Sequence, residues 1–175
     1  MSQASLVVTV IGADRPGLVE ALSTRVSAQG ANWEASRLVR LAGRFAGVVL
    51  VHVDEDKAEA LERELTELAG QGLKINVDRG PGGVEAERPG RRLRVEVVGN
   101  DRQGIVNKIA GVLVGLEVNI EELESSVEIA AMAGEPLFRL HTVLLVQPGV
   151  GDELIRASLE RIAGDLMVDL VPDPR

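Results

Sequence analysis

The sequence contains no cysteine and no tyrosine, and aromatic residues make up only 2 % of it. Without cysteine there can be no disulfides, no thiolate metal ligands and no cysteine nucleophiles, which fits a reducing compartment. Because aromatic residues are so few, the cores must consist of Val, Leu, Ile and Ala. These residues suit β-sheets that are covered by helices.

Long apolar runs and an excess of positive charge are also lacking. No run approaches the roughly 20 residues that a membrane-spanning helix needs, and the start carries no basic segment typical of a signal peptide, so we expect a cytoplasmic protein with no membrane partner. The formal net charge is -8. It disfavours direct nucleic-acid binding because it repels the phosphate backbone. One Trp and two Phe are also too few for the base stacking of an RNA recognition motif.

Patterns that carry catalytic or metal chemistry are missing as well. The only histidines, His52 and His141, stand singly in predicted strands without metal-ligand spacing. No phosphate-binding loop, dinucleotide-binding motif or nucleophile elbow occurs. We therefore expect no enzymatic activity, no metal and no cofactor.

What the sequence does contain is an internal repeat with a constant offset of 87 residues, the interval from Asp14 to Asp101. An ungapped offset across a whole strand, turn and helix indicates a duplication. The identical pairs are Val8/Val95, Val10/Val97, Gly12/Gly99, Asp14/Asp101, Arg15/Arg102, Gly17/Gly104, Val19/Val106, Asn32/Asn119 and Glu34/Glu121.

A polar stretch rich in glycine and proline lies between the two copies. It contains Gly80-Pro81-Gly82-Gly83 and Pro89-Gly90, which is turn and linker chemistry. We therefore predict a first domain over residues 1–80, a linker over 81–91 and a second domain over 92–175.

Hydrophobic periodicity predicts the order βαββαβ in each copy. In the first copy we expect strands at 6–11, 33–41, 44–53 and 73–77, with helices from 18 to near 30 and from 58 to near 70. In the second we expect strands at 93–98, 118–129, 137–147 and 166–171, with helices at 104–116 and 151–163. This order predicts an α+β, ferredoxin-like fold, in which each antiparallel four-stranded sheet carries both helices on one face.

The other face of each sheet has nothing to cover it in an isolated copy. Val48 and Leu50 point away from the side taken by Val49 and Val51, so neither face of this strand reads as solvated, and residues 137–146 behave similarly. The sister domain or a second chain could cover such a face. We expect a pseudo-dimer within the chain that pairs again into a homodimer.

Two equivalent loops, residues 12–17 and 99–104, are candidate binding sites. Each lies between a strand end and a helix start, where backbone N–H groups and the helix dipole favour an anion such as a carboxylate. A purely structural alternative is that the aspartates cap the helices and the last glycines permit tight turns.

Asn32 and Asn119 are candidates of a second kind. Each follows the first helix of its copy, and its amide offers a donor and an acceptor to a zwitterion. Asn also tolerates left-handed backbone, so a turn is the alternative.

Residues 14–19, Asp-Arg-Pro-Gly-Leu-Val, followed by Gly30-Ala31-Asn32-Trp33, resemble the ACT-domain signature, and residues 101–106 with 117–120 are similar to it. The arrangement of two modules without a catalytic domain resembles, more narrowly, the glycine cleavage system transcriptional repressor family. The resemblance implies a regulatory amino-acid site at an interface between two modules. By this resemblance, the residues expected to line the amino-acid site are Gly12, Ala13, Asp14, Gly17, Asn32, Gly99, Asn100, Asp101, Gly104 and Asn119.

The second copy departs from this signature. Gln103 stands where proline is usual and Glu117 where glycine is usual, so we predict unequal affinities at the two sites. The narrower resemblance suggests glycine as the ligand, and serine or alanine would also suit a small pocket.

These expectations describe a non-catalytic, amino-acid-binding transcriptional regulator of glycine cleavage or related amino-acid metabolism. Because the chain has neither a helix-turn-helix nor a basic patch, it would act through a protein partner such as a DNA-binding regulator. A ligand-free interaction or oligomerisation module and a regulatory subunit of an amino-acid metabolic enzyme remain alternatives.

Overall fold

The computed structural model describes residues 2–80, 89–129 and 136–173, and the chain forms two compact units, Met1–Ala86 and Glu87–Arg175. Most of the predicted linker, and most of the loop between the strands expected at 118–129 and 137–147, lie outside the described residues. The last linker position, Arg91, is the first residue of a strand, and Pro136 likewise begins a strand.

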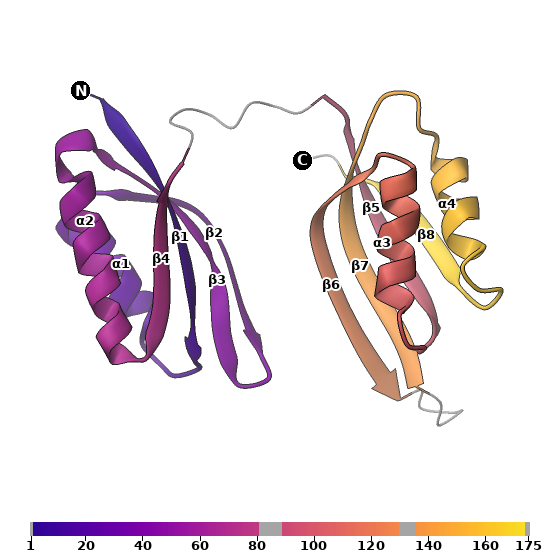
Figure 1. Ribbon diagram of the computed structural model, residues 1–175, viewed down its shortest axis with the longest axis horizontal. Coiled ribbons are helices and arrows are strands. Elements are labelled where there is room, and N and C mark those ends of the chain that lie inside the picture. Colours follow the sequence, from indigo (N-terminus) through magenta and orange to yellow (C-terminus); the bar gives the residue numbers. More distant parts are fainter. Residues whose placement is uncertain (1, 81–88, 130–135, 174–175) are drawn as a thin grey trace. The chain divides into compact units, whose positions relative to one another are not determined.

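Each unit contains the predicted βαββαβ order (Figure 1). The first unit consists of β1 (Gln3–Ala13), α1 (Leu18–Ala28), β2 (Asn32–Leu41), β3 (Arg44–Asp54), α2 (Glu55–Glu67), the short 3-10 helix η1 (Leu68–Gln71) and β4 (Leu73–Arg79). The second consists of β5 (Arg91–Asn100), α3 (Ile105–Gly115), β6 (Asn119–Ile129), β7 (Pro136–Val146), α4 (Asp152–Glu160) and β8 (Met167–Pro172). The ferredoxin-like fold is confirmed.

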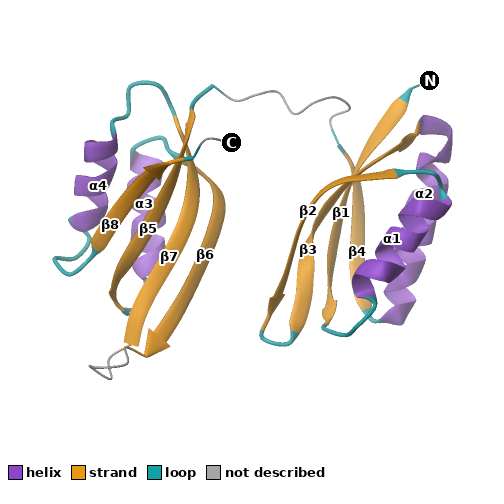
Figure 2. Cartoon of the chain, turned by 180° about the vertical axis from the view of Figure 1, so that it is seen from behind, coloured by secondary structure: helices purple, strands orange, loops and turns teal. Residues whose placement is uncertain are grey.

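The strand order is β2-β3-β1-β4 in the first sheet and β6-β7-β5-β8 in the second, and every strand pair is antiparallel. In each unit both helices cover the same face of the sheet (Figure 2). The helix expected at 151–163 ends three residues earlier, at Glu160, because the Ile162 N–H bonds the Leu159 carbonyl in a tight turn.

The core of each unit lies between its sheet and its two helices. In the first unit Leu6 and Val8 of β1 face this layer beside Val51 and Val49 of β3, and all four are at most 2 % exposed. Leu22 of α1 packs against these side chains and is 1 % exposed, and α2 packs on the same layer. Burial of such side chains contributes about 1.5–3 kcal/mol each, which is why the alternating strand pattern specifies this face.

The opposite faces of the two sheets differ in chemistry. The face of the first sheet that no helix of its unit covers presents exposed apolar side chains, among them Ile11 and Val48, as predicted. The prediction for residues 137–146 is wrong, because the corresponding face of β7 carries Arg139 and His141. The Arg139 guanidinium lies 2.6 Å from the Glu96 carboxylate of β5, so ion pairing can satisfy this face in water.

Candidate functional site

Both predicted loops deliver the chain to a helix through a left-handed glycine. Gly17 has φ 89° and Gly104 has φ 80°, and each is the N-cap residue of its helix. Residues that carry a side chain rarely adopt this left-handed backbone conformation, which explains why glycine occupies both positions. Among the described residues no side chain caps either helix, so the interpretation of Asp14 and Asp101 as capping residues is wrong.

Asp14 instead joins the first loop to the β2–β3 hairpin. Its N–H donates to the Gly43 carbonyl at 3.0 Å, and its carboxylate lies 2.5 Å from Arg40 Nε. The Arg40 side chain is 71 % exposed, so a ligand can displace this ion pair at little cost. The first loop therefore offers a carboxylate beside an open helix N-terminus.

Gly12 and Gly99 serve packing. A Cβ on Gly12 would lie 2.6 Å from Leu73 Cδ2 and 2.8 Å from the Gly72 carbonyl oxygen. A Cβ on Gly99 would lie 2.6 Å from Leu166 Cδ2. The absence of a side chain at these two positions lets the chain before β4 and β8 approach the strand end, which accounts for both glycines without a ligand.

The second loop is already occupied by a carboxylate of its own unit. Asp165 Oδ2 accepts the Asn100 backbone N–H at 2.9 Å, and its other oxygen accepts a hydrogen bond from Arg102 at 2.5 Å. The N–H of Asn100 and then the Arg102 guanidinium hold the pKa of Asp165 below its usual range, because both stabilise the charged form. An anionic ligand at this loop would have to compete with Asp165 for these donors.

The first loop lacks this carboxylate, because Gly72 precedes Leu73 where Asp165 precedes Leu166. The two loops are therefore chemically different. The first is open to an anionic ligand, and the second is already paired with the Asp165 carboxylate of its own unit. Asp165 was missed in the sequence. The one signal for it is that Ala163-Gly164-Asp165-Leu166 is one residue shorter than the matching stretch of the first copy, residues 69–73.

Asn32 and Asn119 are the first residues of β2 and β6. Neither has a positive φ, so the interpretation of these residues as left-handed turn positions is wrong. Gly30 (φ 67°) and Glu117 (φ 55°) take the left-handed conformation two residues earlier. The asparagines are left as extended, exposed residues.

Within one unit the structure does not bring the loop and the asparagine together. Asn32 pairs with His52, and His52 pairs with Ser5 at the start of β1, whereas Asp14 follows the end of β1. At about 3.3 Å per strand residue these places are roughly 30 Å apart. Asn119 is separated from Asp101 in the same way, since it reaches β5 at Arg92 through Leu145.

Each asparagine lies beside an anchored glutamate that the sequence reasoning did not assign. In the first unit the His52 ring contacts the Glu34 carboxylate through Nε2 and lies 3.1 Å from Ser5 Oγ through Nδ1. In the second unit Arg92 holds Glu121 at 2.7 Å. The paired glutamates were visible in the repeat, and their partners follow only from strand register.

Groups of His, Cys, Asp or Glu that could hold a metal ion are absent from the described part of the chain. None of its helices is both long and apolar enough to span a membrane.

Comparison with known proteins fits this geometry. Residues 4–78 match the ACT domain family. The UPF0237 protein MK1213 of Methanopyrus kandleri is 42 % identical over 72 residues, which cover 41 % of this chain and 80 % of that protein. The chain belongs to the ACT-domain family. Its second unit has the same strand order and the same loop geometry as the first, so the chain is a tandem ACT protein.

Two further similarities extend over different lengths. The glycine cleavage system transcriptional repressor of Escherichia coli is 46 % identical over 50 residues, which span 29 % of this chain and only 26 % of the repressor. A crystal structure of an unknown protein from Galdieria sulphuraria is 30 % identical and covers 98 % of this chain and 99 % of its own, with a TM-score of 0.84. A candidate repressor of glycine cleavage shares the fold at 18 % identity and a TM-score of 0.69 over 98 % of this chain. The tandem ACT protein is thus related to regulatory proteins.

Proposed function

We propose that the tandem ACT protein is a non-catalytic regulator that binds a small amino acid, glycine or serine, and passes this signal to a protein partner such as a DNA-binding regulator. The observation that carries the proposal is the first loop, where an exposed Asp14 carboxylate lies beside an uncapped helix N-terminus. An amino acid carries the complementary pair of charges: its carboxylate suits the helix end and its ammonium suits Asp14.

The first module is the main site in this proposal. Asp165 neutralises the second loop, so an amino-acid carboxylate would have to displace an internal one there. No carboxylate stands at the matching position of the first copy, Gly72. We therefore expect tighter binding at Gly12, Ala13, Asp14 and Gly17 than at Gly99, Asn100, Asp101 and Gly104.

Asn32 and Asn119 cannot complete the site of their own module, given the separation of roughly 30 Å along the strand. In this proposal an amino acid that touches both a loop and an asparagine is shared by two modules. Binding would then favour one packing of modules, which is how a ligand can change the affinity of a distant surface for a partner.

The partner and the biological role follow from the relatives. The E. coli relative is a transcriptional repressor of glycine cleavage, and an excess of acidic over basic residues makes direct DNA binding by this chain unfavourable. Regulation of glycine cleavage or related amino-acid metabolism through another protein, in the cytoplasm, is consistent with both.

A thermal-shift screen of the full chain against the common amino acids tests the proposal. At a concentration 100 times the dissociation constant, ligand stabilises the folded state by about 2.7 kcal/mol, or roughly 10–20 °C for a module of this size. We expect glycine or serine to raise Tm, and Asn32→Ala or Asn119→Ala to reduce the rise. If no amino acid raises Tm of the folded chain, the ligand-free interaction module becomes the better account.

A further inference from the structure

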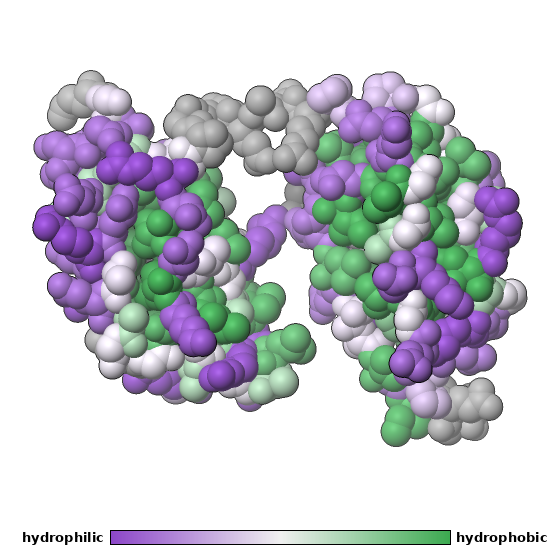
Figure 3. All heavy atoms as spheres, viewed as in Figure 1, coloured by the Kyte–Doolittle hydropathy of each residue, from purple (hydrophilic) through white to green (hydrophobic). Residues whose placement is uncertain are grey.

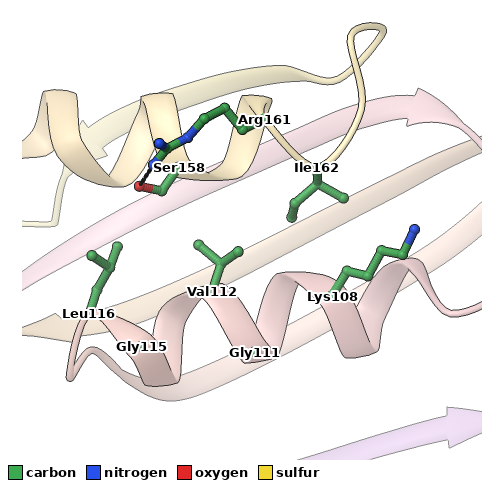
Figure 4. A pocket seen from close by; sticks show the side chains of 8 residues that line it. All are labelled: Lys108, Gly111, Val112, Gly115, Leu116, Ser158, Arg161 and Ile162. Carbon is green, nitrogen blue, oxygen red and sulfur yellow. Dashed lines mark hydrogen bonds between the residues drawn. The ribbon is translucent and has the colours of Figure 1, made fainter.

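The surface over the helices differs in chemistry between the two units. Hydrophobic side chains gather over the part of the second unit that carries α3, whereas the surface over α2 of the first unit is mostly hydrophilic (Figure 3). Between α3 and α4 the second unit has a groove of about 600 Å³ (Figure 4). This volume is within the range of sites that bind ligands in other proteins.

The lining of the groove is largely apolar. Val112 and Leu116 project from α3 toward α4, and Ile162, just after α4, projects toward α3 (Figure 4). Leu154 is 48 % exposed and stands on α4 one turn before Ser158, so it extends the apolar surface along that helix. Apolar side chains of a partner would therefore be removed from water here.

Two glycines of α3 keep the groove open. A Cβ added to Gly111 or Gly115 would meet nothing within 4 Å, so the packing of the second unit does not require glycine at either position. The helix backbone is therefore accessible to close approach by another element. Residues 108–116 span roughly 12 Å at 1.5 Å per residue, which is the length of about two helical turns.

The charged side chains of the groove are all positive. Lys108 stands at one end, and Arg161 of the opposite wall donates to Ser158 Oγ at 2.9 Å. Among the described residues that line the groove none carries a carboxylate, although the chain has 27 acidic residues against 19 basic ones. The groove is thus a local positive site on a negatively charged protein, and its charge suits an acidic partner.

The equivalent place in the first unit has the opposite character. Helices α1 and α3 align with the offset of the repeat, and the buried residues of α2 and α4 align with an offset of 94, as in Leu65 and Leu159. In the first unit the amide of Gln29 bridges the two helices by donating to the Glu64 carboxylate at 2.5 Å. The exchanged residues, first copy first, are Ala21/Lys108, Arg25/Val112, Gln29/Leu116, Glu64/Ser158 and Glu67/Arg161. The first copy therefore supplies a matched surface without the apolar and positive groove.

We propose that the groove between α3 and α4 docks an acidic amphipathic helix of the protein partner. The inference rests on the proposed function, because it names the surface through which that partner is bound. A helix of about three turns covers the groove, and its apolar residues at i, i+3, i+4 and i+7 meet Val112, Leu116 and Ile162. Carboxylates beside this apolar face reach Lys108 and Arg161, which fixes the position of the bound helix.

Two peptides of about 15 residues, each held helical by a hydrocarbon staple, test the proposal without the natural partner. Both carry leucine at i, i+3, i+4 and i+7, and the remaining positions are mainly glutamate in one peptide and mainly lysine in the other. In NMR titrations of the full chain, the glutamate peptide should shift the amide signals of Gly111, Gly115 and Ser158. The net charge of -8 repels this peptide elsewhere, so its binding should be confined to the groove.

Charge reversal in the groove should abolish most of this binding. Lys108→Glu with Arg161→Glu should weaken the affinity for the glutamate peptide by about tenfold or more in fluorescence anisotropy. The matched control is Arg25→Glu with Arg63→Glu on α1 and α2, which changes the net charge by the same amount. It should bind nearly as well as the wild type. Circular dichroism of both variants checks that they are folded.

Several results would overturn the proposal. These are signal shifts outside α3 and α4, equal binding of the lysine peptide in the groove, or an equal loss in the control variant. Octanoate that shifts the same signals when the glutamate peptide does not would assign the groove to a small carboxylate. A lower mass of the groove variant in sedimentation equilibrium would assign it to a second copy of the chain. The rise in Tm with glycine reports separately on the loops, so peptide binding without that rise would leave the groove assignment in place while the amino-acid site fails.

Discussion

Substitution of Gly12 by alanine tests whether this loop residue acts through packing. The new Cβ would lie 2.6 Å from Leu73 Cδ2 and 2.8 Å from the Gly72 carbonyl oxygen. The side chain of Leu73 can rotate, but the carbonyl can move only with the backbone that leads into β4. Overpacking of this kind costs about 1–3 kcal/mol, and each kcal/mol lowers Tm by roughly 4–8 °C in a domain of this size.

Urea unfolding followed by tryptophan fluorescence measures this cost in the correct unit, because Trp33 is the only tryptophan and packs against the first core. Gly70→Ala is the matched control, since its Cβ would meet nothing within 4 Å. Gly99→Ala makes the equivalent clash in the second unit and should leave the Trp33 transition in place. An unchanged midpoint for Gly12→Ala, or an equal loss for Gly70→Ala, would refute the packing argument.

Three further predictions concern individual residues. The pKa of Asp165 is lower in the folded state than in the unfolded state, where it is about 4. The stabilisation that the ionised carboxylate gives to the folded state is therefore present above this unfolded value, and it is lost as pH falls through the folded value. Calorimetry should therefore find Asp165→Asn less stable than wild type at pH 7, and a difference that failed to shrink as pH falls below about 4 would contradict this. Leu61→Ala, at a fully buried position of α2, should cost about 2–5 kcal/mol by Trp33 fluorescence. Glu117→Gly should stabilise the second unit by about 1 kcal/mol in calorimetry of the full chain, and a loss of stability would argue against backbone strain there.

The fold could be predicted because the internal repeat and the strand patterns indicate the same order of elements in both copies. Val8 and Val49, for example, share the inner face that their alternation requires. The pattern failed for β7, where Arg139 and His141 interrupt an apolar run and pair with Glu96 across the sheet. Such ion pairs depend on strand register, which periodicity alone does not supply.

The candidate site was predicted as residue types but not as an arrangement. Asp14 and Asn32 stand close in sequence, yet α1 returns the chain along β1, and so they end at opposite ends of the sheet. Asp165 reaches Asn100 across 65 residues of chain. A contact of that span comes from tertiary folding and leaves almost no local signal.

Calorimetric titration of glycine and of serine into the full chain tests the central claim most directly. The account predicts saturable heat for the wild type, strong loss of binding in Asp14→Ala, and near-normal binding in Asp101→Ala, because Asp165 already neutralises the second loop. Saturable binding that survives Asp14→Ala and disappears in Asp101→Ala would contradict the assignment of the site. The absence of saturable heat for any common amino acid would contradict the proposed function itself.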